Sequence, residues 1–308
     1  MQLLSAAQIR AVLDWEGMLA ALHDTHLGRR PLAGDLFLGD ADYGLFGRGV
    51  ILPGRGAGMK LASIHPANAT ATPPRPTEDA VFVVIDGVTK AITAVLDGPV
   101  ITAYKTAADS ALAARRLSRE DSRVLLVVGA GPVARTLTDA YLHIRPSIDR
   151  ILLWNRSPRK LEQARANLQD RGIDAAIAHD LDDAVSQADI VSTATSATEP
   201  LIRGTYVQPG THVDLVGGFR PDMREADSDL LRRARVFVDD RQSAAATGDI
   251  QIPLKEGVID DSQIEGDLYD LCRWTAWERW PDDITVYKNA GGAHLDLIVS
   301  QYVIDRLC

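Results

Sequence analysis

Cysteine is almost absent from this chain of 308 residues, because Cys272 and Cys308 are the only two and lie far apart. So few thiols exclude a disulfide framework and a zinc site built from cysteines. A surplus of positive charge is also lacking: 33 Lys and Arg face 42 Asp and Glu, for a formal net charge of -9. Such a surface on average repels nucleic acid and anionic membranes. We therefore expect no nucleic-acid partner, although a local basic pocket for a small anion is compatible with this charge.

Long apolar runs and targeting signals are lacking as well. No stretch is long enough to cross a bilayer. The N-terminal sequence MQLLSAAQIRAVLDW already contains charges at Arg10 and Asp14 and has no basic region before an apolar run, so it predicts a folded helix and not a signal peptide. We expect a cytoplasmic protein without a membrane partner. The length favours two domains over one.

The first third of the chain predicts a helix followed by clustered strands. Ser5 is a candidate N-cap of a helix over Ala6–Arg30, in which apolar residues recur at helical spacing. Strands are expected at Leu45–Leu52, Gly58–Ile64, Ala80–Asp86 and Ala91–Leu96, the last two as a hairpin. Because no helices separate these strands, they indicate an antiparallel or mixed sheet.

After Gly98 the pattern changes to alternating helices and strands. A helix at Ile101–Leu117 comes first, and the final helix, from about Gly292, is expected to leave the sheet domain and pack on the first domain. The run Ile284–Tyr287 falls outside the regular alternation. The alternation itself is typical of a doubly wound parallel sheet. The expected strands are Val124–Val128, Arg150–Trp154, Ala175–Ala178, Ile190–Ala194, His212–Val216 and Val236–Val238, and the expected helices are Pro132–Ile144, Ser157–Arg171 and Leu181–Ala188.

The first strand of this alternation runs into a G-x-G-x-x-A turn. Gly129 makes the tight turn, Gly131 lets the backbone approach a pyrophosphate, and Ala134 allows close packing of the following helix. Pro132 and Val133 begin that helix, whose N-terminus offers free N–H groups to phosphates. The alternative is a glycine-rich turn without a ligand. The strand before the turn and the helix after it favour a dinucleotide.

The end of the second strand indicates which dinucleotide binds. An Asp or Glu there would bond the ribose 2′-hydroxyl of NAD, but this chain has Asn155, Arg156 and Ser157. Arg156 and Ser157 suit a 2′-phosphate, and Arg159 adds charge. The alternative is that Arg156 is an ordinary solvated charge. We predict NADPH as the cofactor, with NADH as the weaker candidate.

Two further features concern charged residues. Lys60 lies in an expected apolar strand, where burial of an unpaired ammonium is unfavourable. Either it faces a cleft and meets an anion or a substrate nitrogen, or it is an exposed edge-strand lysine that blocks aggregation. The pairs Asp239-Asp240 and Asp282-Asp283 are predicted to be solvated loop charges. Neither pair comes with the histidines that a transition-metal site needs, so we expect no metal.

Seven stretches of the chain together match a known pattern: Met59–Asn68, Leu96–Ser110, Val128–Arg135, Asp189–Thr195, Val216–Glu225, Ala234–Asp240 and Thr285–Gly291. In these stretches the chain resembles the ornithine cyclodeaminase/µ-crystallin family. This resemblance implies a Rossmann domain at 116–289, inserted in a second α+β domain of 1–115 plus 290–308 that binds substrate and forms a homodimer. Family members include cyclodeaminases, amino-acid dehydrogenases, cyclic ketimine reductases and the ligand-binding µ-crystallin.

The resemblance also implies roles for single residues. Lys60 matches the active-site lysine of the family, and Lys105 stands where most members have an arginine that grips the substrate carboxylate. Lysine keeps the charge but loses the bidentate fork. A second family arginine has no clear match, since Arg30 and Arg48 are both near. Phe219 stands where cyclodeaminases carry an aspartate, and it has no titratable group for their chemistry.

We therefore predict an oxidoreductase of amino-acid metabolism, a ketimine reductase that reduces Δ1-pyrroline-2-carboxylate or Δ1-piperideine-2-carboxylate with NADPH. Lys60 would orient the substrate or donate a proton, Lys105 and Arg48 would hold its carboxylate, and Phe219 would pack against its ring. His65 could relay protons, but a structural role in its His-Pro turn is favoured. Two alternatives are another amino-acid or opine-type dehydrogenase or cyclodeaminase of the family, and a non-catalytic µ-crystallin-like binding protein. The nicotinamide is expected beside Thr193, Ala194, Thr195, Val216 and Gly217.

Overall fold

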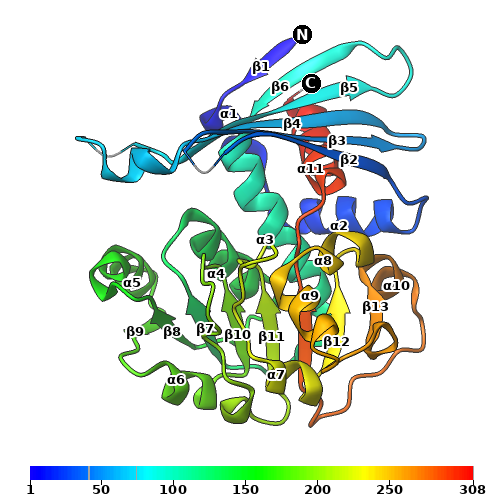
Figure 1. The fold of residues 1–308 in the computed structure, drawn as a ribbon. Helices are drawn as coiled ribbons and strands as arrows, with labels where there is room; N and C mark the ends of the chain where they lie inside the picture. The colour runs from blue at the N-terminus through cyan, green and yellow to red at the C-terminus, as the bar shows by residue number, and fades with distance from the viewer. Residues whose placement is uncertain (41, 74, 308) are drawn as a thin grey trace. The chain divides into compact units, whose positions relative to one another are not determined.

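The computed structural model describes residues 1–40, 42–73 and 75–307, so Cys308 lies outside the described residues. The chain divides into two compact units (Figure 1). Unit 1 comprises Met1–Lys105 and Gly292–Cys308, and unit 2 comprises Thr106–Gly291. The boundary falls within the long helix α3, Gly98–Leu117. The predicted domain limits, which place this helix up to residue 115 before the Rossmann domain, stay a prediction.

Unit 1 is built on a six-stranded mixed sheet in the order β1-β6-β5-β4-β3-β2. Only β1 and β6 pair in parallel, and the other neighbours are antiparallel. The four predicted strands are present, and the sequence reasoning missed β1 and the exposed edge strand β2. The strands are β1 Gln2–Leu4, β2 Leu32–Gly39, β3 Gly44–Leu52, β4 Gly56–Ile64, β5 Glu78–Asp86 and β6 Ile92–Asp97.

Helices cover one face of this sheet. The C-terminal helix α11 (Ala293–Leu307) contacts β3, β4 and β5 and also packs against α2 (Figure 1). The single helix predicted over Ala6–Arg30 is wrong, because the chain forms α1 (Ala6–Val12) and α2 (Trp15–His26). Asp14 breaks the run by capping α2: its carboxylate accepts the N–H of Gly17 at 2.8 Å.

Unit 2 holds an eight-stranded parallel sheet in the order β13-β12-β14-β11-β10-β7-β8-β9. The expected doubly wound parallel sheet is confirmed. The run at 284–287 was misplaced, because β14 is an internal strand between β11 and β12. The strands are β7 Val124–Val128, β8 Arg150–Trp154, β9 Asp174–Ile177, β10 Ile190–Thr193, β11 His212–Leu215, β12 Arg235–Val238, β13 Ile264–Asp267 and β14 Thr285–Lys288.

Helices alternate with these strands along the chain and pack against the sheet (Figure 1). Inner strands such as β7 and β8 are almost entirely buried, which explains why they are apolar runs in the sequence. No helix of the described residues has both the length and the apolar character needed to span a bilayer. The helices are α4 Pro132–Ile144, η2 Pro158–Leu161, α5 Glu162–Asp170, α6 Leu181–Gln187, η3 Gly204–Tyr206, α7 Ser228–Arg233, α8 Arg241–Ala245, α9 Gly248–Lys255, η4 Asp261–Gln263 and α10 Leu268–Arg273, with η1 Pro66–Thr70 in unit 1.

The prediction that Asp239 and Asp240 are solvated charges is wrong. Asp239 is buried, and its carboxylate accepts the N–H groups of Ala290 at 3.0 Å and Gly291 at 2.6 Å. Asp240 caps α8. Asp283 is also engaged, in an ion pair with Arg235 at 2.6 Å. These aspartates hold chain segments in place at the ends of strands, a role that the sequence pattern does not reveal.

Candidate functional site

The glycine turn after β7 has the geometry that a dinucleotide needs. Gly129 adopts φ 130°, and a Cβ there would lie 2.5 Å from the carbonyl oxygen of Ala194, so only glycine fits. A Cβ on Gly131 would have no atom within 4 Å. Gly131 is the N-cap of α4 without a side-chain cap, and Pro132 follows it in the first turn. The open space and the uncapped N–H groups fit a pyrophosphate.

The end of β8 adjoins this turn, because the N–H of Gly129 donates to the carbonyl of Trp154 at 2.9 Å. Asn155 folds its side chain back to the carbonyl of Ser157 at 3.0 Å. The side chains of Arg156 and Arg159 are exposed, and neither forms an ion pair with a described residue. No acidic residue occupies the strand end, in agreement with the sequence. The loop therefore presents free cations where the adenosine ribose of a dinucleotide lies.

The predicted nicotinamide loops follow β10 and β11, and one residue that the sequence reasoning missed ties them together. The buried Glu225 carboxylate accepts hydrogen bonds from the hydroxyls of Thr193 and Thr195, both at 2.7 Å. It also accepts the backbone N–H of Thr195 at 2.7 Å and that of Gly217 at 2.6 Å. A Cβ on Gly217 would collide with Thr195, at 2.0 Å from its carbonyl oxygen. Glu225 thus fixes the path of both loops, including Ala194 and Val216 next to these contacts.

A second buried carboxylate, that of Asp249, holds the backbone of Glu225 in place. Asp249 accepts the backbone N–H of Glu225 at 2.7 Å and forms a fully buried ion pair with Lys288 at 3.0 Å. Burial raises the pKa of Glu225, the neighbouring Asp249 raises it further, and Lys288 opposes the shift. The only cue in the sequence was that Glu225 ends one of the stretches that carry the family resemblance.

In unit 1, Lys60 lies on the helix-covered face of the central strand β4. Its ammonium donates to the hydroxyl of Thr102 at 2.9 Å and lies 3.8 Å from Glu78. The side chain is only 12% exposed and its strand is internal, so the alternative of an edge-strand lysine is wrong. Burial lowers the pKa of Lys60; Lys105 and Arg48 lower it further, while Asp296 and Glu78 oppose them.

Lys105 and Arg48, the other basic residues predicted to bind the substrate, lie close enough to Lys60 to lower its pKa, and the three form a cationic cluster. Lys105 is buried and lies 3.5 Å from the carboxylate of Asp296 on α11. Arg48 stands directly opposite Lys60 across the β3–β4 ladder, and its guanidinium forms a bidentate pair with Asp35 at 2.7 and 2.8 Å. Asp296 was missed, although a charged residue within the apolar run of the last helix was a signal of the same kind as Lys60.

A pair of buried histidines lies beside this cluster. His294 Nε2 is 3.3 Å from His26 Nε2, and His26 Nδ1 is 2.7 Å from the carbonyl oxygen of Leu22. Burial lowers the pKa of His294 well below its ordinary value, and His26, Lys105 and the arginines Arg30 and Arg48 act in the same direction. The imidazole is therefore neutral near pH 7. Arg30 contributes its charge here at a distance.

Two predicted site residues lie elsewhere in their units. His65 directly follows β4, and its Nδ1 lies 2.7 Å from the carbonyl oxygen of Asp42, while its ring meets that of Tyr43 edge to face. These contacts fit a structural role in the His-Pro turn. Phe219, in unit 2, is 59% exposed and follows Gly218 after β11. The roles of both residues in substrate binding stay predictions.

Unit 2 has a Rossmann-type sheet with a glycine turn for a dinucleotide, and unit 1 has a cluster of basic side chains. These two features are typical of an oxidoreductase that uses a nicotinamide cofactor. The family model "Ornithine cyclodeaminase/mu-crystallin family" matches residues 52–308, and the chain belongs to that family. A curated relative from Paracoccus denitrificans, Delta(1)-pyrroline-2-carboxylate reductase, is 41% identical over 304 residues, which cover 98% of this chain and 96% of the relative.

Solved structures agree in fold over the whole chain. The structure of Thermococcus litoralis Delta(1)-pyrroline-2-carboxylate reductase in complex with NADH and L-proline matches with a TM-score of 0.92 and 26% identity, covering 99% of this chain and 97% of that one. A probable ornithine cyclodeaminase from Bordetella pertussis matches with a TM-score of 0.88 and 28% identity, covering 100% and 97%. The predicted family and fold class are confirmed.

Proposed function

We propose that this protein reduces Δ1-pyrroline-2-carboxylate to proline with NADPH. The observation that carries the proposal is the buried cationic cluster of unit 1, in which Lys105 pairs with Asp296 at 3.5 Å and Lys60 is close enough to both for their charges to shift its pKa. The names of the relatives agree with the predicted reductase activity. Unit 2 contributes the glycine turn and the loops that Glu225 holds, so the chain carries both parts that the reaction needs.

The reaction converts a C=N bond into CH–NH. NADPH, when bound, supplies the hydride, and the imine nitrogen takes a proton. The protonated iminium accepts a hydride more readily than the neutral imine, so a proton donor near neutral pH is required. Lys60 fits this role, because its ammonium is buried and its pKa is lowered, which makes it a stronger acid than a solvated lysine.

The substrate also carries a carboxylate, which needs a cationic partner in a buried site. Lys105 is that partner in our proposal. Its 3.5 Å separation from Asp296 is longer than a strong charge-assisted hydrogen bond, so the ammonium has capacity for a second anion. Arg48 on the same face adds positive potential, although Asp35 holds its guanidinium. Phe219 has no carboxylate to handle an amine, and this favours the reductase over a cyclodeaminase.

We propose NADPH and not NADH because of the residues that follow the end of β8. Arg156, Ser157 and Arg159 follow Asn155 there, and no acidic side chain competes for the ribose. The Thermococcus litoralis relative is described with NADH, so our choice of NADPH for this chain rests on the residues of the loop after β8.

We further propose a homodimer formed through the outer face of the unit 1 sheet. Residues that alternate with the inward-facing Lys60 leave this face apolar and exposed, and monomeric proteins rarely leave so many apolar side chains together in solvent. These residues are Leu3, Leu32, Leu36, Ile51, Met59, Leu61 and Val81, with exposed fractions from 36% to 72%.

The experiment that tests the function is NADPH oxidation, followed by absorbance, with the five-membered and six-membered ketimine carboxylates as substrates. The same assay is run with NADH, and with keto acid plus amine in place of the ketimine. Ornithine with NAD tests cyclodeamination through ammonia release. We expect rapid turnover of the five-membered ketimine with NADPH. Binding of NADPH without turnover of any ketimine would identify a binding protein instead of a reductase.

A further inference from the structure

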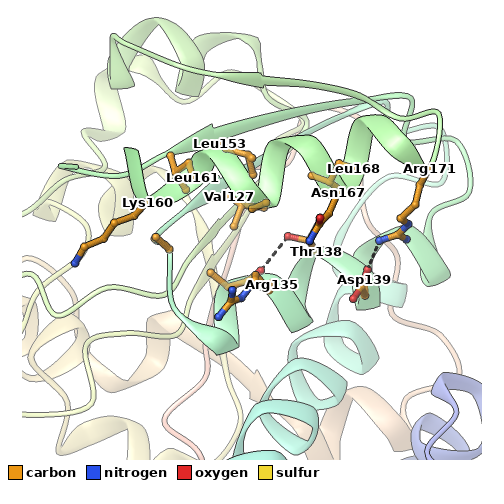
Figure 2. Close-up of a pocket in the computed structure, with 14 residues that line it drawn as sticks. Val127, Arg135, Thr138, Asp139, Leu153, Lys160, Leu161, Asn167, Leu168 and Arg171 are labelled. Atoms are coloured by element: carbon orange, nitrogen blue, oxygen red, sulfur yellow. Dashed lines mark hydrogen bonds and ion pairs between the residues drawn. The ribbon is translucent and has the colours of Figure 1, made fainter. Parts of the chain in front are cut away.

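A pocket lies between α4 and the segment formed by η2 and α5 in unit 2 (Figure 2). The strand residues Val127 and Leu153 and the helix residue Leu168 give it an apolar lining. Gly129 and Ala130 of the dinucleotide turn line the same pocket. The pocket therefore reaches the place where the turn meets the end of β8.

Three basic side chains line this pocket, and they differ in one respect. Arg171 is neutralised, because it forms an ion pair with Asp139 at 2.7 Å, and Figure 2 shows the two together at one end of the pocket. Lys160 lies at the other end, with Arg135 between. Neither Arg135 nor Lys160 forms an ion pair or side-chain hydrogen bond with any residue in the described part of the chain. Unpaired cations are notable here, since acidic residues outnumber basic ones by 42 to 33.

Arg135 and Lys160 both belong to chain segments next to the loop Asn155–Ser157, which we propose binds the ribose. The N–H of Lys160 donates to the carbonyl of Ser157 at 3.0 Å, so the chain turns back on the loop that contains Arg156. Arg135 belongs to the first turn of α4, directly after the glycine fingerprint. Arg159, in contrast, does not line the pocket.

We infer that Arg135 and Lys160 bind the 2′-phosphate of NADPH and so determine cofactor specificity together with Arg156. The inference rests on the proposed function, since it takes NADPH as the cofactor. A phosphate monoester carries about 1.5 to 2 negative charges at pH 7, and one exposed arginine neutralises only part of that. Arg135 and Lys160, two further unpaired cations beside the same loop, supply the positive charge that balances the rest of the phosphate charge.

The test uses the full chain and two probes that differ mainly in the 2′-phosphate. Calorimetry gives the Kd of adenosine 2′,5′-bisphosphate and of 5′-AMP for the wild type, Arg135→Gln, Lys160→Gln and the double variant. Arg171→Gln is the matched control, because it removes a cation from the same pocket that Asp139 already neutralises. Each test variant should weaken binding of the bisphosphate about tenfold, the loss of one charge-assisted contact, and change binding of 5′-AMP less than twofold. The control should leave both values unchanged.

Three other outcomes would contradict the inference in distinguishable ways. Equal weakening of both probes would place Arg135 and Lys160 on the 5′-phosphate, which NADH shares. Unchanged binding in the double variant, with a wild type that prefers the bisphosphate, would refute their role and leave the proposed NADPH preference intact. A wild type that binds both probes equally would refute the inference and the NADPH preference together. Reductase turnover with NADH, measured in parallel, shows whether the proposed reaction itself survives.

Discussion

Glu225 Oε2 accepts the N–H of Gly217 at 2.6 Å, and its other oxygen accepts the N–H of Thr195 at 2.7 Å. One buried carboxylate therefore joins the loops that follow two neighbouring parallel strands. Both oxygens face N–H donors, so an amide group at this position would place its own N–H against one of them. Because these loops lie where α/β sheets bind their ligands, we expect the carboxylate to hold them in the arrangement that the cofactor needs.

Glu225→Gln should therefore reduce kcat/KM for NADPH about tenfold or more, since one buried donor loses its acceptor. The thermal midpoint separates this effect from a loss of folding. The exposed Glu199→Gln, in the same region of the chain, should leave both quantities unchanged. A Glu225→Gln enzyme with a lowered midpoint but full kcat/KM at low temperature would show that the carboxylate serves stability alone.

Lys60 can be tested as a proton donor through the pH profile of kcat. Its pKa is lowered from 10.5 by burial, so the acidic form that the reaction needs is lost as pH rises, and the rate should fall through an alkaline limb below pH 10.5. Lys60→Arg keeps the positive charge but does not deprotonate in this range. We expect it to lower kcat about 100-fold and to remove the limb. An arginine variant that keeps both the rate and the limb would assign the proton to another group.

Carboxylate binding by Lys105 predicts a different kinetic signature. Lys105→Met keeps most of the side-chain volume in a buried position and removes the charge. The KM for the ketimine should rise about tenfold or more, while the KM for NADPH changes little. Lys255→Met, on the exposed end of α9, is a control for the loss of one positive charge. Equal losses for substrate and cofactor would point to a structural role for Lys105.

The sequence predicts unit 2 better than unit 1, and the reason is physical. The bounds of β7, α4 and β8 agree with the prediction, because strands buried on both faces are apolar throughout and the glycine turn marks the start of the helix. The edge strand β2 (Leu32–Gly39) was missed, since neither of its faces is buried and its sequence has no strand pattern.

The candidate site shows the same limit for single side chains. Lys60 could be singled out because a charge in an apolar strand conflicts with its surroundings. Glu225 and Asp239 resemble ordinary surface charges in sequence, and only tertiary structure buries them. Asp296 lies between these cases, within the apolar helix α11, and the same conflict that marked Lys60 would have marked it.

Because the carboxyl of Asp214 is buried, we expect the free energy of unfolding to depend on pH. This carboxyl is fully buried on β11, where it accepts hydrogen bonds from Ser110 and Ser192 at 2.8 Å, and burial raises its pKa from 3.8 to about 6. The folded state therefore binds this proton more tightly than the unfolded state, so the contribution to stability is full below pH 4 and is lost as pH rises through 6. The difference amounts to at most about 3 kcal/mol.

Denaturant unfolding at several pH values checks this expectation against Asp214→Asn. The amide resembles the protonated acid, and serine hydroxyls can accept as well as donate hydrogen bonds. The free energy of unfolding of the wild type should fall relative to the variant between pH 4 and 7 and stay level above that. A constant difference over the whole range would show that Asp214 titrates in the folded state near its ordinary pKa.

The proposed homodimer can be tested at Leu61. This side chain is 42% exposed and lies on the outer face of β4, next in sequence to the inward-facing Lys60. Leu61→Arg should convert the dimer to a monomer, measured by light scattering after size-exclusion chromatography, because a charge buried at an apolar interface without a partner is strongly unfavourable. Val88→Arg is the matched control, since Val88 is 88% exposed in the turn between β5 and β6, away from that face. A wild type that is monomeric at micromolar concentration, or a Leu61→Arg protein that remains dimeric, would refute this interface.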